Sequence, residues 1–400
     1  MTGTTTSDRF PWVGLFTLSL LVFFSVTSEF LPTGLLPDIA RDLDVTEPQV
    51  GLLLTVFAAT VVVTAAPLTT LTRRFPRKTL LIAVILVFVL SNLGAAIAPT
   101  YEALVVARIA SGVAHGLFWS IVGAYSAHLV PKRSLGRAVA IVSGGGTAAF
   151  VLGIPIGTAV GHAVGWRLAF VVIAAVLLVL TFVTMRTLPA VQHLVAPTTG
   201  EIAVPLRRDR SVPGVVIICI VIVIIMTGQN IFSTYVVPFL IGPTGLDPAA
   251  VAGVLFFNGG AGAIGVILAG LLIDRHPRAV LVFALLGVMA SVLVVGLVPD
   301  NPWVVLPAMV AWGFSFGGIP SMVQTRMLHT ASARLRDVAS AYQATAFNVG
   351  IGGGALIGGV LFDRLGVTSL PFVLVGGVGL GLVVFVLGDR WLVARQRQHG

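Results

Sequence analysis

Residues 22–38 read VFFSVTSEFLPTGLLPD, and this stretch decides what kind of protein the chain is. It lies in an apolar run that begins near Trp12 and is long enough to cross a lipid bilayer. Glu29 stands in the middle of that run, four residues before Thr33. A carboxylate inside hydrocarbon costs about 3 kcal/mol on the mildest scales, and it is normally kept where it faces a protein interior or a water-filled path. We therefore interpret Glu29 as a proton-binding residue with a function inside the membrane.

The composition is that of an integral membrane protein. Of the 400 residues 57% are hydrophobic and only 10% are charged, and the mean hydropathy is +1.04. A soluble protein has about a quarter of its residues charged, so this chain cannot cover a water-facing surface. The net charge of +9 does not indicate nucleic-acid binding, because the basic residues occur in short clusters between apolar segments. The single cysteine, Cys219, lies in an apolar run, which excludes a disulfide framework and a cysteine metal site.

Apolar segments of about 20 residues recur along the chain, with polar breaks between them. No A-x-A cleavage signal precedes the first segment, so we expect a retained helix there rather than a signal peptide. The pattern predicts an all-α integral membrane protein with twelve transmembrane helices, over residues 12–36, 49–71, 79–98, 102–129, 137–160, 167–186, 213–240, 249–272, 279–298, 303–325, 337–361 and 369–389.

The basic residues predict how the chain is oriented in the membrane. They concentrate in the segments that follow every second span, whereas the alternate segments carry only Arg41, Arg167 and Arg364. Because Lys and Arg accumulate in cytoplasmic loops, we expect a multi-pass protein of the cell membrane with both termini in the cytoplasm. The opposite side is acidic near the first span, with Asp38, Asp42, Asp44 and Glu47.

The chain divides into two similar halves. A shift of 201 residues places LTRRFPRKTLL (71–81) on LIDRHPRAVLV (272–282). Between the halves, residues 187–212 contain three prolines and three arginines, which is typical of a linker. We predict two six-helix pseudo-repeats, formed by a bundle in residues 1–186, a cytoplasmic linker in 187–212 and a second bundle in 213–400. Parallel repeats of this kind place a substrate site between the halves, near the midplane of the membrane.

Several motifs resemble those of one transporter family. TSEFLPTGLLPDIA (27–40) resembles the first-helix signature of bacterial exporters, and RIASG (108–112) has the arginine four residues before a glycine that marks their fourth helix. GGGTAAFVLGIPIG (144–157) resembles the antiporter signature of the fifth helix. The chain thus resembles the major facilitator superfamily along nearly its whole length. Within it, the chain looks like the twelve-helix drug/proton antiporters and their sugar-efflux, nucleoside-efflux and chloramphenicol-export relatives.

The family's loop signature, G-x-L-x-D-R-x-G-R-K, appears twice with changes. In TTLTRRFPRK (69–78), Thr69 and Arg73 replace the first glycine and the acid, whereas GLLIDRHPR (270–278) keeps Asp274. The resemblance implies the major facilitator fold, a gating contact that Asp274 carries alone, and a fifth helix that seals the path between the halves. For the fifth helix, close packing at its glycines is the alternative. The gating candidates are Arg74, Arg77, Lys78, Gly153, Pro155, Gly157, Asp274, Arg275 and Arg278.

Glu29 and Arg108 fall at the same depth in the membrane. Glu29 lies nine residues before Asp38 and Arg108 six residues after Glu102, so at 1.5 Å per residue both lie about 10 to 14 Å below the outer surface. Arginine stays charged, so we expect Arg108 to act as a fixed cation beside Glu29, with a purely structural ion pair as the alternative. His115 shares a helix face with Arg108, and it is either a third proton-coupling residue or an interhelical hydrogen bond.

Polar and aromatic residues near the middle of the spans predict a substrate cavity. Asn230 is the counterpart of Glu29 under the 201-residue shift, so the second half keeps a polar group there without the charge. Each such residue alone is more often an interhelical contact than a ligand, but together they outline a mixed polar and aromatic cavity. The candidates for substrate binding are Thr33, Trp119, Thr227, Gln229, Asn230, Asn258, Phe314, Phe316 and Asn348.

The buried acid and the internal repeat favour transport over catalysis. We find no Walker loop, no H-E-x-x-H motif and no serine elbow in the sequence, and we expect no cofactor and no metal. The leading hypothesis is a monomeric, proton-coupled antiporter that exports a small organic molecule, of the drug, sugar or nucleoside class, by alternating access. A proton-independent facilitator of the same fold is the nearest alternative, and a membrane receptor or enzyme is a more distant one.

The topology can be tested by cysteine labelling in a background in which Cys219 is replaced by Ser. A cysteine at Arg41 or Arg364 is expected to react with an impermeant maleimide added to intact cells, because both segments are predicted outside. A cysteine at Arg133 or Arg207 is expected to react only after the cells are opened. The reverse pattern would overturn the predicted orientation.

Overall fold

The computed structural model describes residues 10–72, 74–131, 134–190, 209, 211–273, 275–332 and 335–399. Within these residues no strand occurs, and twelve helical segments are long and apolar enough to cross a membrane. The predicted all-α membrane fold is therefore confirmed. The boundaries of the linker stay a prediction, because most of residues 187–212 lie outside the described residues.

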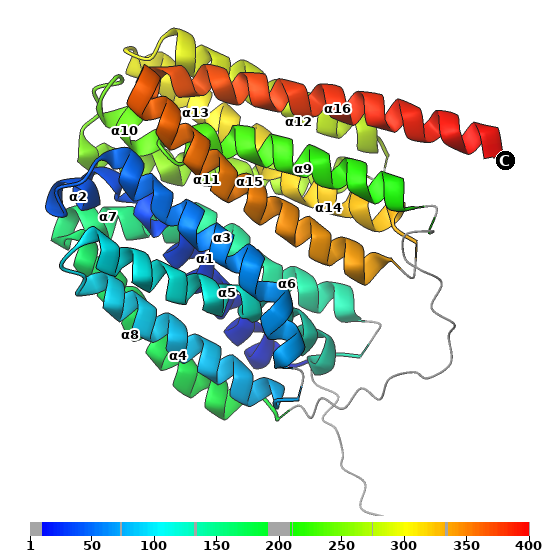
Figure 1. Cartoon of the computed structure of the whole chain (residues 1–400), viewed down its shortest axis with the longest axis horizontal. Helices are drawn as coiled ribbons and strands as arrows, with labels where there is room; N and C mark the ends of the chain where they lie inside the picture. Colours follow the sequence, from blue (N-terminus) through cyan, green and yellow to red (C-terminus); the bar gives the residue numbers. More distant parts are fainter. Residues whose placement is uncertain are drawn as a thin grey trace, which may run out of the picture.

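The helices of the first half run in alternate directions and are joined by short connections (Figure 1). They are α1 (Trp12–Gly34), the short α2 (Leu36–Asp42), α3 (Glu47–Leu71), α4 (Arg77–Ala96), α5 (Tyr101–Leu129), α6 (Leu135–Ala148), the π-helix η2 (Ala149–Gly153), α7 (Ile154–Val164) and α8 (Trp166–Thr187).

The second half repeats this order. It consists of α9 (Val212–Ser233), the short α10 (Val236–Ile241), α11 (Pro248–Leu272), α12 (Pro277–Leu297), α13 (Pro302–Gly317), α14 (Ile319–Thr330), α15 (Arg336–Leu365), the 3-10 turn η4 (Val367–Ser369) and α16 (Leu370–His399). The starts of α3, α5 and α6 precede those of α11, α13 and α15 by 201 residues, so the sequence repeat is also a structural repeat.

Several predicted spans are interrupted close to prolines, which cannot donate the backbone N–H of a continuing helix. The first span ends at Leu35, two residues before Pro37, and the tenth is broken at Gly318, two residues before Pro320. The fifth span contains η2 directly before Pro155, so it is formed by α6, η2 and α7 together. The seventh predicted span, residues 213–240, is likewise divided into α9 and α10 close to Pro238. The prediction of single continuous helices over these four stretches was therefore too simple.

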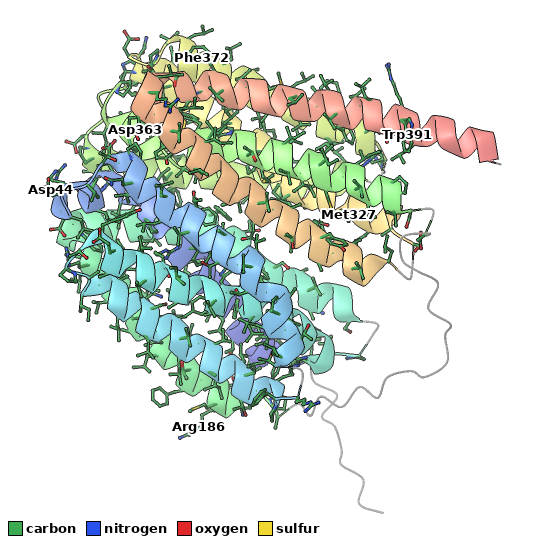
Figure 2. The ribbon with its side chains drawn as sticks, viewed as in Figure 1. Asp44, Arg186, Met327, Asp363, Phe372 and Trp391 are labelled. Atoms are coloured by element: carbon green, nitrogen blue, oxygen red, sulfur yellow. The ribbon has the colours of Figure 1, made fainter. Side chains whose placement is uncertain are left out.

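The two ends of the molecule differ in charge. We call the end at which α2 and α10 contact each other the capped end, and the end at which α4 and α12 begin the basic end. Figure 2 shows Asp44 and Asp363 at the capped end, whereas Arg186 lies at the basic end. The separation follows the clusters of basic residues that the sequence places after every second span.

Glycines on the fifth span let it pack closely against α1. A Cβ atom at Gly153 would lie 2.0 Å from Oγ1 of Thr27, and one at Gly157 would lie 2.8 Å from Cδ1 of Leu31. Pro155 is buried on the same stretch. Both glycines therefore contact a helix of their own half, and the seal between the halves that the family resemblance implies for them stays a prediction.

The second half uses the same packing between α15 and α9. A Cβ atom at Gly354 would lie 2.6 Å from Cβ of Asn230, and one at Gly358 would lie 2.5 Å from the carbonyl oxygen of Ile231. These glycines are the counterparts of Gly153 and Gly157 under the 201-residue shift. Small residues thus fix the first and fifth spans of each half to each other.

Two contacts between the halves are related to each other by the 201-residue shift. A Cβ atom at Gly259 of α11 would lie 2.8 Å from Cα of Val151, in η2 of the first half. A Cβ atom at Gly352 of α15 would lie 3.0 Å from Cβ of Ala58, in α3. Val151 corresponds to Gly352 and Ala58 to Gly259, so the interface repeats one contact about a pseudo-two-fold axis.

Tyr235 closes the interface at the capped end. It comes from the second half, directly after α9, and its hydroxyl donates to the carbonyl oxygen of Ala355 at 2.8 Å. A Cβ atom at Gly51 of α3 would lie 2.2 Å from this hydroxyl oxygen, and one at Gly359 of α15 would lie 2.7 Å from it. The phenol ring is fully buried, so two glycines from opposite halves form the space that it fills.

Backbone contact also joins α11 to α13. A Cβ atom at Gly317 would lie 2.1 Å from the carbonyl oxygen of Gly262, and one at Gly265 would lie 2.0 Å from that of Phe314. Backbone atoms cannot turn away as a flexible side chain can, so these positions require glycine. Gly270 lies on α11 like Gly265, but a Cβ atom added there would meet no other atom within 4 Å.

We therefore predict that Gly265→Ala destabilises the protein and that Gly270→Ala does not. Overpacking costs about 1–3 kcal/mol, and the two helices would have to separate to admit the methyl group. Thermal unfolding in detergent measures the difference, with Gly270→Ala as the matched control on α11. Equal melting temperatures for the two variants would contradict the close contact of α11 with α13.

Candidate functional site

A cluster of ionisable side chains lies in the first half, between α1 and α5. Glu29 from α1 and Arg108 and His115 from α5 are all buried, with exposed fractions of 5%, 2% and 3%. These three residues are predicted from the sequence to form one proton-coupling group, and the structure brings them together. Their role in proton coupling stays a prediction.

Arg108 completes the hydrogen bonding of α1 at a proline. Pro32 has no N–H group to donate to the carbonyl oxygen of Ser28, one helical turn earlier. Nη1 of Arg108 donates to that oxygen at 2.9 Å, and Nη2 donates to the carbonyl oxygen of Glu29 at the same distance. A buried carbonyl without a partner costs about 1–3 kcal/mol, so Arg108 stabilises the first span at the position of Glu29.

The guanidinium group of Arg108 is held against an aromatic ring. Its Cζ atom lies 4.6 Å from the ring centre of Phe57, a residue of α3 that is fully buried. The same ring meets the imidazole of His115 edge to face, with 5.1 Å between centres. Between the described side chains of Arg108 and Glu29 there is no ion pair within 4 Å. Arg108 thus lies beside Glu29 as predicted, but it bonds to backbone and not to the carboxylate.

His115 is the side chain that contacts the carboxylate. Its Nε2 atom lies 3.5 Å from Oε2 of Glu29 and accepts a hydrogen bond of 2.7 Å from Nε1 of Trp119. Its Nδ1 atom lies 3.0 Å from Oγ of Ser25. Because the indole nitrogen can only donate, Nε2 carries a lone pair, which assigns the ring proton to Nδ1 and makes Ser25 the acceptor. The cluster therefore has a neutral imidazole next to a carboxyl group.

Four further residues of this site were not predicted from the sequence. Ser25 and Phe57 contact His115, and the hydroxyl of Ser28 donates to Oδ1 of Asn92 on α4 at 2.8 Å. The two serines and Asn92 are polar residues in apolar spans, a signal that could have found them. Phe57 gives no such signal, because a phenylalanine in a membrane span is ordinary.

The second half has neutral residues at the corresponding place. Nδ2 of Asn230, the counterpart of Glu29, donates to the carbonyl oxygen of Met226 on its own helix at 2.9 Å. Oε1 of Gln229 accepts from Nε1 of Trp312 at 3.1 Å, and this indole stacks on Phe232 with ring centres 5.3 Å apart. In the part of the chain that the structure describes, buried titratable groups thus concentrate in the first half.

The other predicted substrate residues are spread over both halves. Asn258 donates to the carbonyl oxygen of Met309 at 2.7 Å and so joins α11 to α13. The side chains of Thr33 and Asn348 donate to backbone oxygens of their own helices, Phe30 at 2.7 Å and Ala344 at 3.0 Å. Phe314 is exposed, whereas the structure leaves Thr227 and Phe316 half-buried. A role in binding stays a prediction for each of them.

The charged gating candidates that the structure describes lie at the basic end. Lys78 donates to the carbonyl oxygen of Met185 at 2.7 Å, which ties α4 to α8. Arg77 is buried, whereas Arg74 and Arg275 are exposed. Asp274 lies outside the described residues, so the gating contact predicted for it has no structural description.

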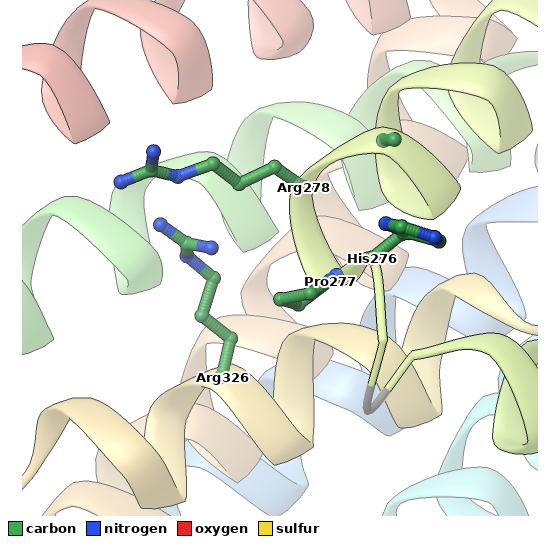
Figure 3. A pocket seen from close by; sticks show the side chains of 5 residues that line it. His276, Pro277, Arg278 and Arg326 are labelled. Atoms are coloured by element: carbon green, nitrogen blue, oxygen red, sulfur yellow. The ribbon is translucent and has the colours of Figure 1, made fainter.

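Arg278 takes part in an ion-pair cluster within the second half. Its Nε atom lies 2.5 Å from Oδ2 of Asp389 on α16, and the other oxygen of Asp389 pairs with Arg326 of α14. Figure 3 shows the guanidinium groups of Arg278 and Arg326 pointing toward each other at a pocket that His276 and Pro277 also line. The cluster fastens three helices of one bundle at the basic end.

The arrangement of two six-helix repeats around a buried acid can be compared with known proteins. The sequence model of the Major Facilitator Superfamily matches residues 18–355. The chain belongs to the major facilitator superfamily. The resemblance seen in the motifs is thereby confirmed, and the chain is a membrane transporter rather than an enzyme.

Curated relatives within the superfamily cover almost the whole chain. A protein described as a probable sugar efflux transporter of Helicobacter pylori is 31% identical over 377 residues, which is 94% of each chain. A protein of the same description from Helicobacter acinonychis is 30% identical over 369 residues, 92% of each. These relatives therefore match this transporter over nearly its whole length.

Solved structures share the fold at low sequence identity. A bacterial homologue of the human lysosomal transporter Spinster, in an inward-facing and unoccupied conformation, matches with a TM-score of 0.70 at 16% identity, over 98% of each chain. A mutant of the nucleoside transporter NupG matches with a TM-score of 0.74 at 14% identity, over 94% of this chain and 98% of that one. These likenesses confirm the major facilitator fold.

The bond between Arg108 and the carbonyl of Ser28 predicts a specific double-mutant result. Arg108→Ala is expected to lower the free energy of unfolding by about 2 kcal/mol, because a buried carbonyl loses its partner. In a Pro32→Ala background residue 32 regains its N–H, so the same change is expected to cost about 1 kcal/mol less.

Thermal unfolding of the four proteins in detergent gives the coupling between the two positions. Pro67→Ala, at another proline inside a helix of the same half, serves as the control and is expected to leave the cost of Arg108→Ala unchanged. If Pro32→Ala and Pro67→Ala behave alike, Arg108 does not stabilise α1 through the freed carbonyl.

Proposed function

We propose that this transporter is a proton-driven exporter of small, neutral, sugar-like molecules. Two observations support the proposal. The relatives that match the chain from end to end are described as probable sugar efflux transporters. A carboxyl group that is sealed from water lies 3.5 Å from an imidazole inside the first half.

The contact between Glu29 and His115 carries the proton-coupling part of the proposal. Glu29 is the only buried carboxyl group among the described side chains. Burial favours the protonated form of a carboxyl group, and access to water or a nearby cation favours the charged form. A change of conformation that alternates these surroundings takes up a proton on one side of the membrane and releases it on the other.

We infer that the conformation described here faces the cytoplasm. The basic end is the end at which α1 begins and α16 ends, and the positive-inside rule assigns it to the cytoplasm. The halves contact each other at the capped end through Tyr235, Gly51 and Gly359. In this interpretation an outgoing molecule enters from the basic end, and export requires Tyr235 to leave its site between the halves.

The proposed substrate class agrees with the side chains available for binding. Trp119 and Phe314 expose 42% and 43% of their surface, and Asn348 and Thr227 are partly accessible polar groups. Aromatic faces and neutral hydrogen-bonding groups suit a polyhydroxylated ring better than an ion. Drugs and nucleosides of similar polarity are the competing substrate classes.

We predict that Glu29→Gln abolishes uphill transport driven by a pH gradient. The amide mimics the protonated acid and cannot release a proton, so a gradient can no longer be used. Exchange of substrate without a gradient is expected to persist. Proteoliposomes with an imposed pH gradient, tested with radiolabelled sugars, nucleosides and phenicols, measure both activities.

Glu102→Gln is the control for this experiment, because Glu102 is an exposed acid in the first turn of α5. It is expected to transport like the natural protein. If Glu29→Gln still accumulates substrate against its gradient at the natural rate, Glu29 is not the coupling acid and His115 is tested next. If the natural protein shows no gradient-driven accumulation at all, the chain is a facilitator.

A further inference from the structure

Two groups approach the same nitrogen atom of His115. Nε1 of Trp119 donates to Nε2 at 2.7 Å, and Oε2 of Glu29 lies 3.5 Å from the same atom. A neutral imidazole has one lone pair, and here the indole N–H occupies it. Trp119 is also the one member of the trio that is open to its surroundings, with 42% of its surface exposed, whereas Glu29 and His115 are buried.

A proton shared between Glu29 and His115 and the bond from Trp119 exclude each other. A protonated Glu29 is a donor, and the lone pair of Nε2, 3.5 Å from its Oε2 atom, is an acceptor for it. Nε2 has a single lone pair, so it cannot accept from the carboxyl group and from the indole at once. A proton on Glu29 that is shared with Nε2 therefore displaces the indole.

We propose that Trp119 is a positioning residue that sets the competition between proton and substrate, by occupying Nε2 of His115 whenever the Glu29–His115 pair holds no shared proton. A substrate that stacks on the exposed face of the indole keeps it in this place and so opposes protonation. A proton that enters the pair releases the indole and loosens the substrate. This inference rests on the proposed function. It makes the binding of the proton and the binding of the substrate oppose each other, as antiport requires, so that one ligand is bound at a time.

Few charged groups among the described side chains lie close to His115. The helices packed against α5 are α1, α3, α4 and α6. Glu29 of α1 and Arg108 of α5 itself are the charged residues whose contacts reach the site. The other described charges on these helices lie at the helix starts, namely Glu47 of α3, Glu102 of α5, Arg77 and Lys78 of α4, and Arg137 of α6. Arg137 stacks on the rings of Phe10 and Trp12.

The test measures the proton affinity of the pair without any substrate. The infrared carbonyl band of protonated Glu29, assigned by its loss in Glu29→Gln, is titrated in the purified protein. Trp119→Phe keeps an aromatic ring and removes the N–H that competes with the proton. The midpoint of the band is therefore expected to move to higher pH by about 0.7 unit, the equivalent of one neutral hydrogen bond.

Trp312→Phe is the matched control for the titration, because it removes a buried indole N–H that is bonded to Gln229 in the other half. Its midpoint is expected to equal that of the natural protein. In the proteoliposome assay, Trp119→Phe is expected to lose a larger fraction of the accumulation driven by a pH gradient than of the exchange without a gradient.

The possible outcomes separate this inference from the proposed function. If the Glu29 band titrates with the same midpoint in the natural protein and in Trp119→Phe, the competition is refuted while proton coupling at Glu29 stands. An unchanged gradient-driven accumulation in Trp119→Phe would also refute it. If no Glu29 band titrates between about pH 5 and 9, the range in which such a pair must exchange its proton, the proposed function fails as well.

Discussion

The hydrogen bond between Arg108 and the carbonyl oxygen of Ser28 is the interaction on which the site depends. Pro32 opens the hydrogen-bond ladder of α1, and a charged side chain from α5 closes it. The two helices are thereby fixed at the height of Glu29. The same arginine is stacked on Phe57 of α3, so three helices are located by one guanidinium group. The position of His115 next to the carboxyl group follows from this arrangement.

Much of the fold was predictable because a bilayer imposes simple rules on sequence. Spans of about 20 apolar residues, basic clusters after alternate spans and a constant 201-residue offset are visible in the chain itself. The glycines of RIASG and GGGTAAFVLGIPIG were also visible, but their partners were not. Gly153 packs on Thr27 of its own half, and no spacing rule distinguishes that contact from one with the other half.

The site was predictable as a set of residue types, whereas its connections were not. An acid, an arginine and a histidine in apolar spans are costly enough to be conspicuous, so Glu29, Arg108 and His115 were found. Equal depth suggested a bond between the acid and the arginine. In the structure the arginine instead donates to backbone carbonyl oxygens, and the acid lies next to the imidazole. That choice depends on the missing N–H of Pro32 and on helix rotation, which sequence spacing does not fix.

The interface between the halves is built from backbone and small residues. Gly259 meets Val151, Gly352 meets Ala58, and Gly51 receives the phenol of Tyr235. The ion pairs found among the described residues all join groups within one half. Separation of the halves at the capped end thus breaks no described salt bridge. We therefore expect ionic strength to have little influence on such an opening step, and the thickness of the surrounding bilayer to have more.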